Sequence, residues 1–317
     1  MDAALFRRID GVRERLADLS LTAEQQRVLA RYHLKFTRAG AALDAERKAR
    51  LAEINERLAA LGTEFGQHVL ADEQDHAIVL EHEQDLDGLP PFVRIAARAA
   101  AEERGIAGKH AITLSRSSVV PFLEFSARRD LREKVFKEWI ARGDGGGTND
   151  NKVIIAQMLA LRAERAQLLG YRSFAEYRLA DSMAKTPDAV RALLDTVWTR
   201  ARSRALADRD ALQALVQEEG GNFKLEAWDW RYYAEKLRKR RCDIDAASIK
   251  PYLQLERMIE AAFYTAQRLF GLSFEPVANV PVWHPDLRVW EVRDGHGRHR
   301  GVFFGDYFAR NSKHSGA

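Results

Sequence analysis

A long amphipathic pattern between residues 41 and 70 constrains the fold more than any other feature of this sequence. Apolar residues recur there at intervals of three and four, at Leu51, Ile54, Leu58, Leu61 and Phe65. This spacing places them on one face of an α-helix, and charged residues fill the other face. The stretch therefore predicts a long helix that has an apolar side to bury.

Most of the remaining chain also favours helices, because Ala, Leu, Arg and Glu dominate and only 8 of the 317 residues are proline. Thr22 is expected to cap a helix without a strict capping box. Thr186 and Pro187 suit the cap and the first position of another helix, which extends to about residue 218. Residues 111–114 resemble a short strand. Further helices are expected near residues 92–104, 131–139, 228–241 and 251–269. Another, capped by Thr148, Asn149 or Asp150, is expected to run to about residue 169.

The pattern changes after Gly271. Residues 272–277, 287–292 and 301–304 have extended or alternating character, and Asp294-Gly295 is a turn signal between the last two segments. We therefore predict a mainly α fold that carries the start of a small β-sheet at the C-terminus. The predicted division is a helical region over residues 1–271 and a β-rich region over residues 272–317.

Charge and composition exclude several classes of partner. The 50 basic and 46 acidic residues give a net charge of +4, and the two signs alternate almost everywhere. The run KLRKRR at residues 236–241 favours a solvated helix end over a nucleic-acid site. No apolar stretch approaches a membrane span of roughly 18 residues. The charged N-terminus lacks a signal-peptide core, so the predicted location is cytoplasmic, without nucleic-acid or membrane partners.

Several segments, in order along the chain, resemble the thimet oligopeptidase and peptidyl-dipeptidase family of zinc metallopeptidases, and the bacterial peptidyl-dipeptidase branch most strongly. The most telling are Trp228-Asp229-Trp230 with the tyrosines that follow, and the closing pattern Asp306-x-x-x-Arg310-x-x-Lys313-x-x-Gly316-Ala317. The other segments are residues 112–125, 128–133, 168–177 and 182–187. Together they cover essentially the whole chain.

The resemblance implies a helical lobe of a zincin-type oligopeptidase that hydrolyses short peptides in a deep channel. In the family, two histidines of an H-E-x-x-H helix and a carboxylate from a following helix hold one zinc ion. The glutamate of that motif polarises the zinc-bound water, whose pKa the metal lowers to roughly 7.

That motif is missing from this sequence. His82-Glu83-Gln84-Asp85-Leu86 begins like it, but Leu86 stands where the second histidine is needed, and a loop coincidence is the better interpretation. The single cysteine, Cys242, excludes a cysteine-based zinc framework. We therefore predict no catalytic and no metal-binding residues in this chain. Zinc is a cofactor of the full-length family, and none is expected to bind here.

In the family, the zinc helix lies downstream of the segment matching residues 313–317, and other sequence lies upstream. The chain thus resembles the middle of a longer enzyme, whose partners are short peptides and the missing C-terminal catalytic portion. Gly316 and Ala317 resemble a strand at the lip of the cleft, which makes them candidate substrate-binding residues; a simple turn is the alternative. This chain alone is predicted to be inactive.

Two further alternatives stay open from the sequence. The chain is a fragment of a zinc peptidase, a non-catalytic helical module that binds peptides or proteins, or a piece that pairs in trans with a separate chain bearing the zinc helix. The aromatic residues at 228–233 form either helix core, which their spacing favours, or a peptide-binding wall. The aromatic residues at 303–308 are expected to leave an apolar patch and a sheet edge exposed.

Overall fold

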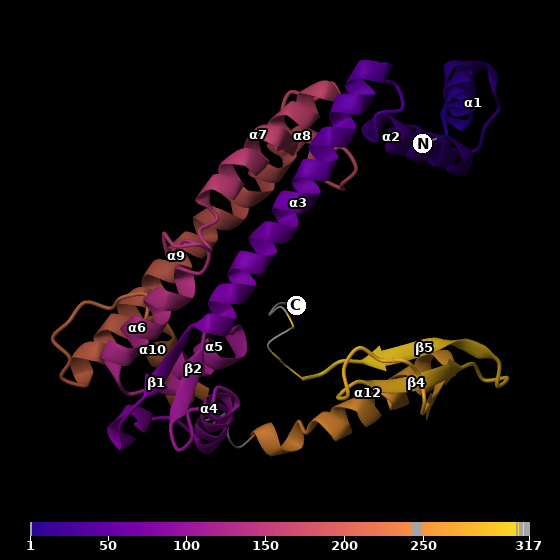
Figure 1. Cartoon of the computed structure of the whole chain (residues 1–317). Helices are drawn as coiled ribbons and strands as arrows, with labels where there is room; N and C mark the ends of the chain where they lie inside the picture. The colour runs from indigo at the N-terminus through magenta and orange to yellow at the C-terminus, as the bar shows by residue number, and fades with distance from the viewer. Residues whose placement is uncertain (1, 243–248, 309, 311–312, 314–317) are drawn as a thin grey trace. The chain divides into compact units, whose positions relative to one another are not determined.

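The computed structural model describes residues 2–242, 249–308, 310 and 313. The fold is mainly α with two small antiparallel sheets, β1-β2 and β3-β4-β5 (Figure 1). This confirms the predicted fold class. Among the described residues, no helix is both long and apolar enough to cross a bilayer.

The chain forms two compact units, which are described separately. The first contains residues up to Asp72 together with Ala141–Asp210, and the second contains Glu73–Ile140 and the chain from Ala211 onward. The helices α3 and α9 contribute residues to both. Because this grouping follows contacts and the predicted boundary at residue 271 follows composition, that boundary stays a prediction.

The first unit is helical. It contains α1 (Ala3–Glu14), a short η1 (Leu16–Asp18), α2 (Ala23–Arg38), most of α3 (Ala45–Asp75), α7 (Lys152–Leu168), α8 (Phe174–Leu179) and the start of α9 (Pro187–Glu218). Phe6 stacks on Phe36 to join α1 and α2, with ring centroids 6.0 Å apart. Arg50 of α3 makes a two-pronged ion pair with Glu164 of α7, with N–O distances of 2.6 and 2.9 Å.

Local chemistry sets several helix ends in this unit. Thr22 accepts a hydrogen bond from the Gln25 backbone while the Gln25 side chain accepts one from Thr22, so a capping box is present where none was expected. The expectation was wrong because Gln25 occupies the position that the reciprocal bond requires. Thr186 caps α9 by accepting from the Ala189 backbone, as predicted.

The second unit holds the better-buried core. It includes β1 (Ala77–Leu80), η2 (Glu83–Leu86), α4 (Pro91–Glu103), β2 (His110–Thr113), α5 (Arg116–Phe125), α6 (Arg129–Ile140) and α10 (Trp230–Cys242). β1 pairs antiparallel with β2, with Ile78 opposite Ile112. Both residues, with Val119, Phe122 and Val135, are at most 2% exposed in one apolar cluster. The helices α4 and α5 contact β2 and close this core.

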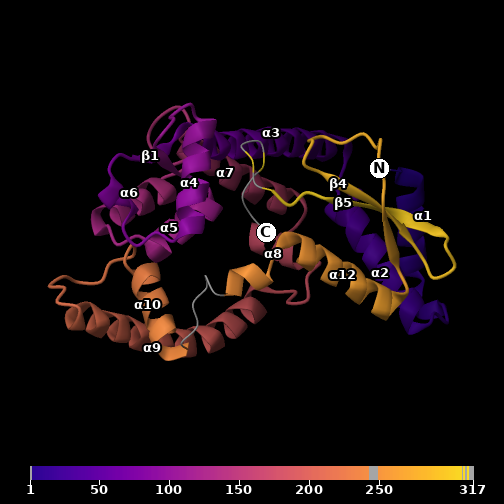
Figure 2. The ribbon, with the colours of Figure 1, turned by 90° about the horizontal axis from the view of Figure 1, so that it is seen from below.

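The same unit ends in η3 (Lys250–Tyr252), α12 (Leu255–Phe270) and a sheet of β3 (Ser273–Pro276), β4 (Arg288–Arg293) and β5 (His299–Gly305). Gly271 ends α12 in a left-handed conformation at φ 66°, which favours glycine. β4 is central and antiparallel to both neighbours, with Trp290 opposite Phe303. Phe263 of α12 stacks on Phe274 with ring centroids 4.0 Å apart. Figure 2 shows α12 running along this sheet.

Candidate functional site

The two residues predicted to bind substrate, Gly316 and Ala317, lie outside the described residues. The structure does describe part of the segment that leads to them. Gly305 ends β5, and Asp306, Arg310 and Lys313 follow within the pattern that carried the family resemblance. The candidate site therefore consists of residues that precede position 316.

Asp306 binds both cationic residues of that pattern. Arg310 donates from Nη1 and Nη2 to the two carboxylate oxygens, at 2.7 and 2.9 Å. Lys313 Nζ donates to the Asp306 backbone oxygen at 2.6 Å and lies 3.3 Å from Oδ1. The hydrogen bonds from Arg310, followed by those from Lys313, hold the pKa of Asp306 well below its usual range. The carboxylate thus stays ionised and fixes the course of the chain after β5; we call these three residues the Asp306 clamp.

Aromatic side chains surround the start of the Asp306 clamp. Trp283 stacks on Phe304 with ring centroids 5.7 Å apart, and Tyr307 packs edge-on against Trp290 at 6.5 Å. Phe303, Phe304 and Phe308 are nevertheless 39%, 37% and 45% exposed. Such a set of partly exposed rings is typical of a contact surface rather than of a finished core. The predicted exposure of aromatic residues at 303–308 is therefore observed.

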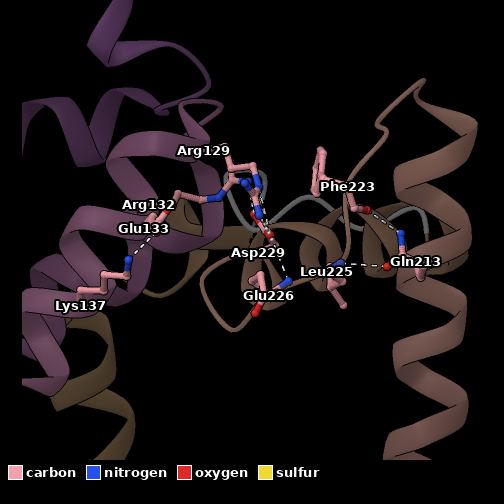
Figure 3. A network of polar contacts seen from close by, with 9 residues as sticks. All are labelled: Arg129, Arg132, Glu133, Lys137, Gln213, Phe223, Leu225, Glu226 and Asp229. Carbon is pink, nitrogen blue, oxygen red and sulfur yellow. Dashed lines mark hydrogen bonds and ion pairs between the residues drawn. The ribbon is translucent and has the colours of Figure 1, made fainter.

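A second polar network fixes the other telling segment (Figure 3). Asp229 is fully buried, and Arg129 and Arg132 of α6 bind it. The closest contacts are 2.8 Å from Arg132 Nη2 to Oδ1 and 3.0 Å from Arg129 Nη2 to Oδ2. Arg132 is only 1% exposed and also donates to the Ser126 backbone oxygen at 2.8 Å. Because a buried charge needs such partners, this network ties the start of α10 to α6.

Aromatic rings and an amide complete the surroundings of Asp229. The Arg129 guanidinium lies 4.3 Å from the centroid of the Phe223 ring and 5.7 Å from that of Trp228. The Gln213 side chain bridges the Phe223 oxygen and the Leu225 nitrogen at 3.0 and 2.8 Å. The network thus holds the turn before α10 in one conformation.

The aromatic residues at 228–233 pack mainly into the core of the unit and do not form a continuous exposed wall for a peptide. Tyr233 is 6% exposed and packs with Leu212, Leu215 and Val216, whereas Trp230 is 37% exposed. The basic run at the end of α10 is ion-paired with α9, through Lys236 to Glu219 and Arg240 to Glu218, each at 2.7 Å. These pairs support the predicted solvated helix end.

The described residues do not fit a zinc ion. Among them, no group of three or more His, Cys, Asp or Glu side chains is arranged to hold a metal. His82 precedes the short helix η2, Glu83 lies 3.4 Å from Arg94, and Leu86 is buried in the apolar core. Asp85 accepts from the backbone nitrogens of Glu81 and His82, which with Arg128 lower its pKa. The HEQDL segment therefore has a structural role in the second unit.

Comparison with known proteins defines the class. Over 318 aligned residues the chain is 36% identical to dipeptidyl carboxypeptidase of Escherichia coli K12, covering 100% of the chain and 47% of that protein. Oligopeptidase A of the same organism is 31% identical over 302 residues, or 94% of the chain and 44% of that protein. The matched proteins are peptidases, and the chain spans about half of their length.

The family is defined by a second comparison. The sequence model of Peptidase family M3 matches residues 122–317, and the chain therefore belongs to this family. The match includes both Asp229 and the Asp306 clamp. The family resemblance inferred from the sequence is thus confirmed.

Sequence reasoning recognised Asp229, Asp306, Arg310 and Lys313 as parts of a pattern but assigned them no contacts. It did not single out Arg129 and Arg132 as partners of Asp229. These arginines precede Asp229 by 100 and 97 positions, so local periodicity carries no sign of the pairing. The available signal was an aspartate placed between two tryptophans, because a carboxylate in apolar surroundings requires a cationic partner.

Proposed function

We propose that this chain is a portion of a zinc-dependent M3 peptidase that hydrolyses short peptides, and that polypeptide outside these 317 residues supplies the zinc ligands. The observation that carries the proposal is the family match over residues 122–317, together with the coverage of only 47% of the dipeptidyl carboxypeptidase relative. The missing H-E-x-x-H motif agrees with this division of roles.

In this proposal the chain contributes position rather than chemistry. The Asp229 network fixes the framework around α6 and α10. The Asp306 clamp fixes the direction in which the chain leaves β5 toward Gly316 and Ala317. Small residues there admit close approach of a peptide backbone, which supports their proposed role in substrate binding. Zinc supplies the activated water when the complete site is present.

A cytoplasmic location also stays a prediction.

The test is a pair of measurements on the purified 317-residue chain. Elemental analysis after dialysis measures bound zinc, and a fluorogenic oligopeptide measures turnover with and without a chelator. We expect no stoichiometric zinc and no chelator-sensitive turnover. One tightly bound zinc per chain, or chelator-sensitive activity that co-purifies with the chain over several columns, would contradict the proposed division of roles.

The exposed aromatic surface at Phe303, Phe304 and Phe308 also favours a second candidate, a non-catalytic module that binds peptides or proteins. Sequencing of the gene beyond the codon for Ala317 separates the two candidates. A downstream H-E-x-x-H in any frame supports the peptidase portion. A stop codon with no trace of the motif supports the binding module.

A further inference from the structure

A cavity of about 440 Å³ lies within the first unit, among residues that have no part in the proposed function. Arg31, Tyr32, Lys35 and Arg38 of α2 line one wall, while Tyr177 of α8 and Asp181 from the following turn line the other. Its volume lies within the roughly 300–1,000 Å³ that is typical of small-molecule sites. All of the lining residues belong to the first unit, so the cavity depends only on packing within that unit.

Positive charge dominates the cavity. The cavity is lined by three cationic side chains, Arg31, Lys35 and Arg38, and by a single carboxylate, Asp181. Arg31 makes an ion pair with this carboxylate, and Arg38 lies 3.5 Å from it. Asp181 can neutralise only one of the three charges, which leaves a formal excess of two. Lys35 makes no ion pair with any residue that the structure describes. An anion in the cavity would thus meet a cation that has no competing protein partner.

Arg38 is the most enclosed of the three cations, with a side chain only 16% exposed. Its guanidinium carbon lies 4.6 Å from the centroid of the Tyr177 ring, which holds the planar group in place. A guanidinium held at the cavity wall in this way, with the Asp181 carboxylate 3.5 Å away, favours an oxyanion acceptor.

We propose that this cavity binds a small organic or inorganic oxyanion, a carboxylate or a phosphate, between Lys35 and Arg38. The tyrosine rings of Tyr32 and Tyr177 provide apolar walls for the remainder of an organic ligand. The proposal does not rest on the proposed peptidase function, because neither the Asp229 network nor the Asp306 clamp contributes a residue to the cavity.

Calorimetric titration of the 317-residue chain tests the site with two probes at constant ionic strength. Inorganic phosphate is the first probe, and N-acetyl-dialanine with a free carboxylate is the second. N-acetyl-dialanine amide, which lacks the charge, is the neutral control. We expect saturable binding of at least one charged probe and none of the amide. The probe that binds more tightly identifies the source of the oxyanion.

Three variants locate the binding. Lys35→Met should weaken it about tenfold, since a charged hydrogen bond is lost, whereas Lys35→Arg should retain it. Asp181→Asn should tighten it, because Arg31 and Arg38 lose their competing partner, and general loss of structure would give the opposite sign. Lys48→Met removes an exposed lysine of α3 and should change nothing. Absence of saturable binding, or equal weakening by Lys35→Met and Lys48→Met, would overturn the proposal.

Discussion

The two small sheets of the second unit differ in how completely they are covered. Around β1 and β2, Ile112, Val119 and Phe122 are 1%, 0% and 0% exposed, because α4, α5 and α6 pack over the strands. Around β5, Phe303 and Phe304 are 39% and 37% exposed although α12 packs on the same sheet. The first sheet is a completed folding core, whereas the second retains an aromatic surface available for contact.

The difference separates two uses of apolar residues in one chain. Residues of the β1–β2 core stabilise the fold by leaving water, at about 25 cal/mol per Å² of apolar surface. The exposed rings on β5 contribute less to this chain and would gain that stabilisation on contact with other polypeptide. Their position directly before the Asp306 clamp agrees with the proposal that further sequence completes the site.

The largest expected effect comes from breaking the network that anchors the completed core. Asp229→Ala leaves Arg132 buried without its carboxylate, and we expect the free energy of unfolding to fall by about 3–5 kcal/mol. Denaturant unfolding measures this change. Glu226→Ala in the same turn is the control, because Glu226 is exposed and uses its backbone to reach Asp229. Equal, small effects of the two variants would show that the network is not structurally important.

The comparison of the two sheets predicts a difference between two phenylalanines. Phe122→Ala should destabilise the chain by about 3–5 kcal/mol, because it opens a cavity in a closed core. Phe304→Ala should cost less than about 1 kcal/mol, since over a third of that side chain already faces water. Denaturant midpoints of the two variants measure the difference. Similar losses for both would mean that the second sheet is as well buried as the first.

The exposed aromatic surface should also govern self-association. Phe304→Ser removes the ring that stacks on Trp283, itself 65% exposed. We expect the variant to show less self-association than the parent chain at equal concentration, with little change in helix content. Sedimentation velocity and circular dichroism check the two parts. Unchanged self-association would mean that the chain associates through another apolar surface. Leu193 and Trp198 of α9, which are 67% and 66% exposed, are one example.

The smallest effect concerns pH and the Asp306 clamp. The pKa of Asp306 is lowered in the folded chain by Arg310 and Lys313, so the clamp stabilises the fold above the unfolded value of about 3.9. That contribution is lost as the pH falls below 3.9 and through the lower folded pKa. NMR titration of the Asp306 carboxyl carbon should therefore show no step near pH 4, and Asp306→Asn should remove its signal alone. A midpoint near 3.9 would mean that the clamp is open in solution.

Local sequence chemistry was sufficient for much of this fold. Thr186 and Pro187 specify the start of α9, and Gly271 specifies the end of α12. In the turn between β4 and β5, Asp294 accepts from the backbone nitrogens of His296 and Arg298, whereas the left-handed glycine is Gly297 rather than Gly295. Each signal acts within a few residues, through capping, a left-handed backbone or a turn. The family assignment likewise needed only short ordered motifs.

The features that sequence reasoning missed depend on distant partners. β1 was not predicted because Ala77–Leu80 follows α3 almost directly and pairs with a strand about thirty residues later. The helix α5 was not predicted, because the expected strand at residues 111–114 precedes it directly and Pro121, which is disfavoured in a helix interior, lies inside it. The Asp229 network could not be predicted, because it joins α6 to the residue before α10 and no pattern within a single segment shows that the two lie together.

Native-state hydrogen exchange on the monomeric chain tests the central contrast most directly. We predict that the hydrogen-bonded amides of β1 and β2 exchange only through global unfolding, and that those of β4 and β5 exchange much faster through local opening. Protection over residues 289–307 as strong as that over residues 78–80 and 110–113 would contradict this account. The chain would then complete its own C-terminal sheet, and the non-catalytic binding module would become the better explanation.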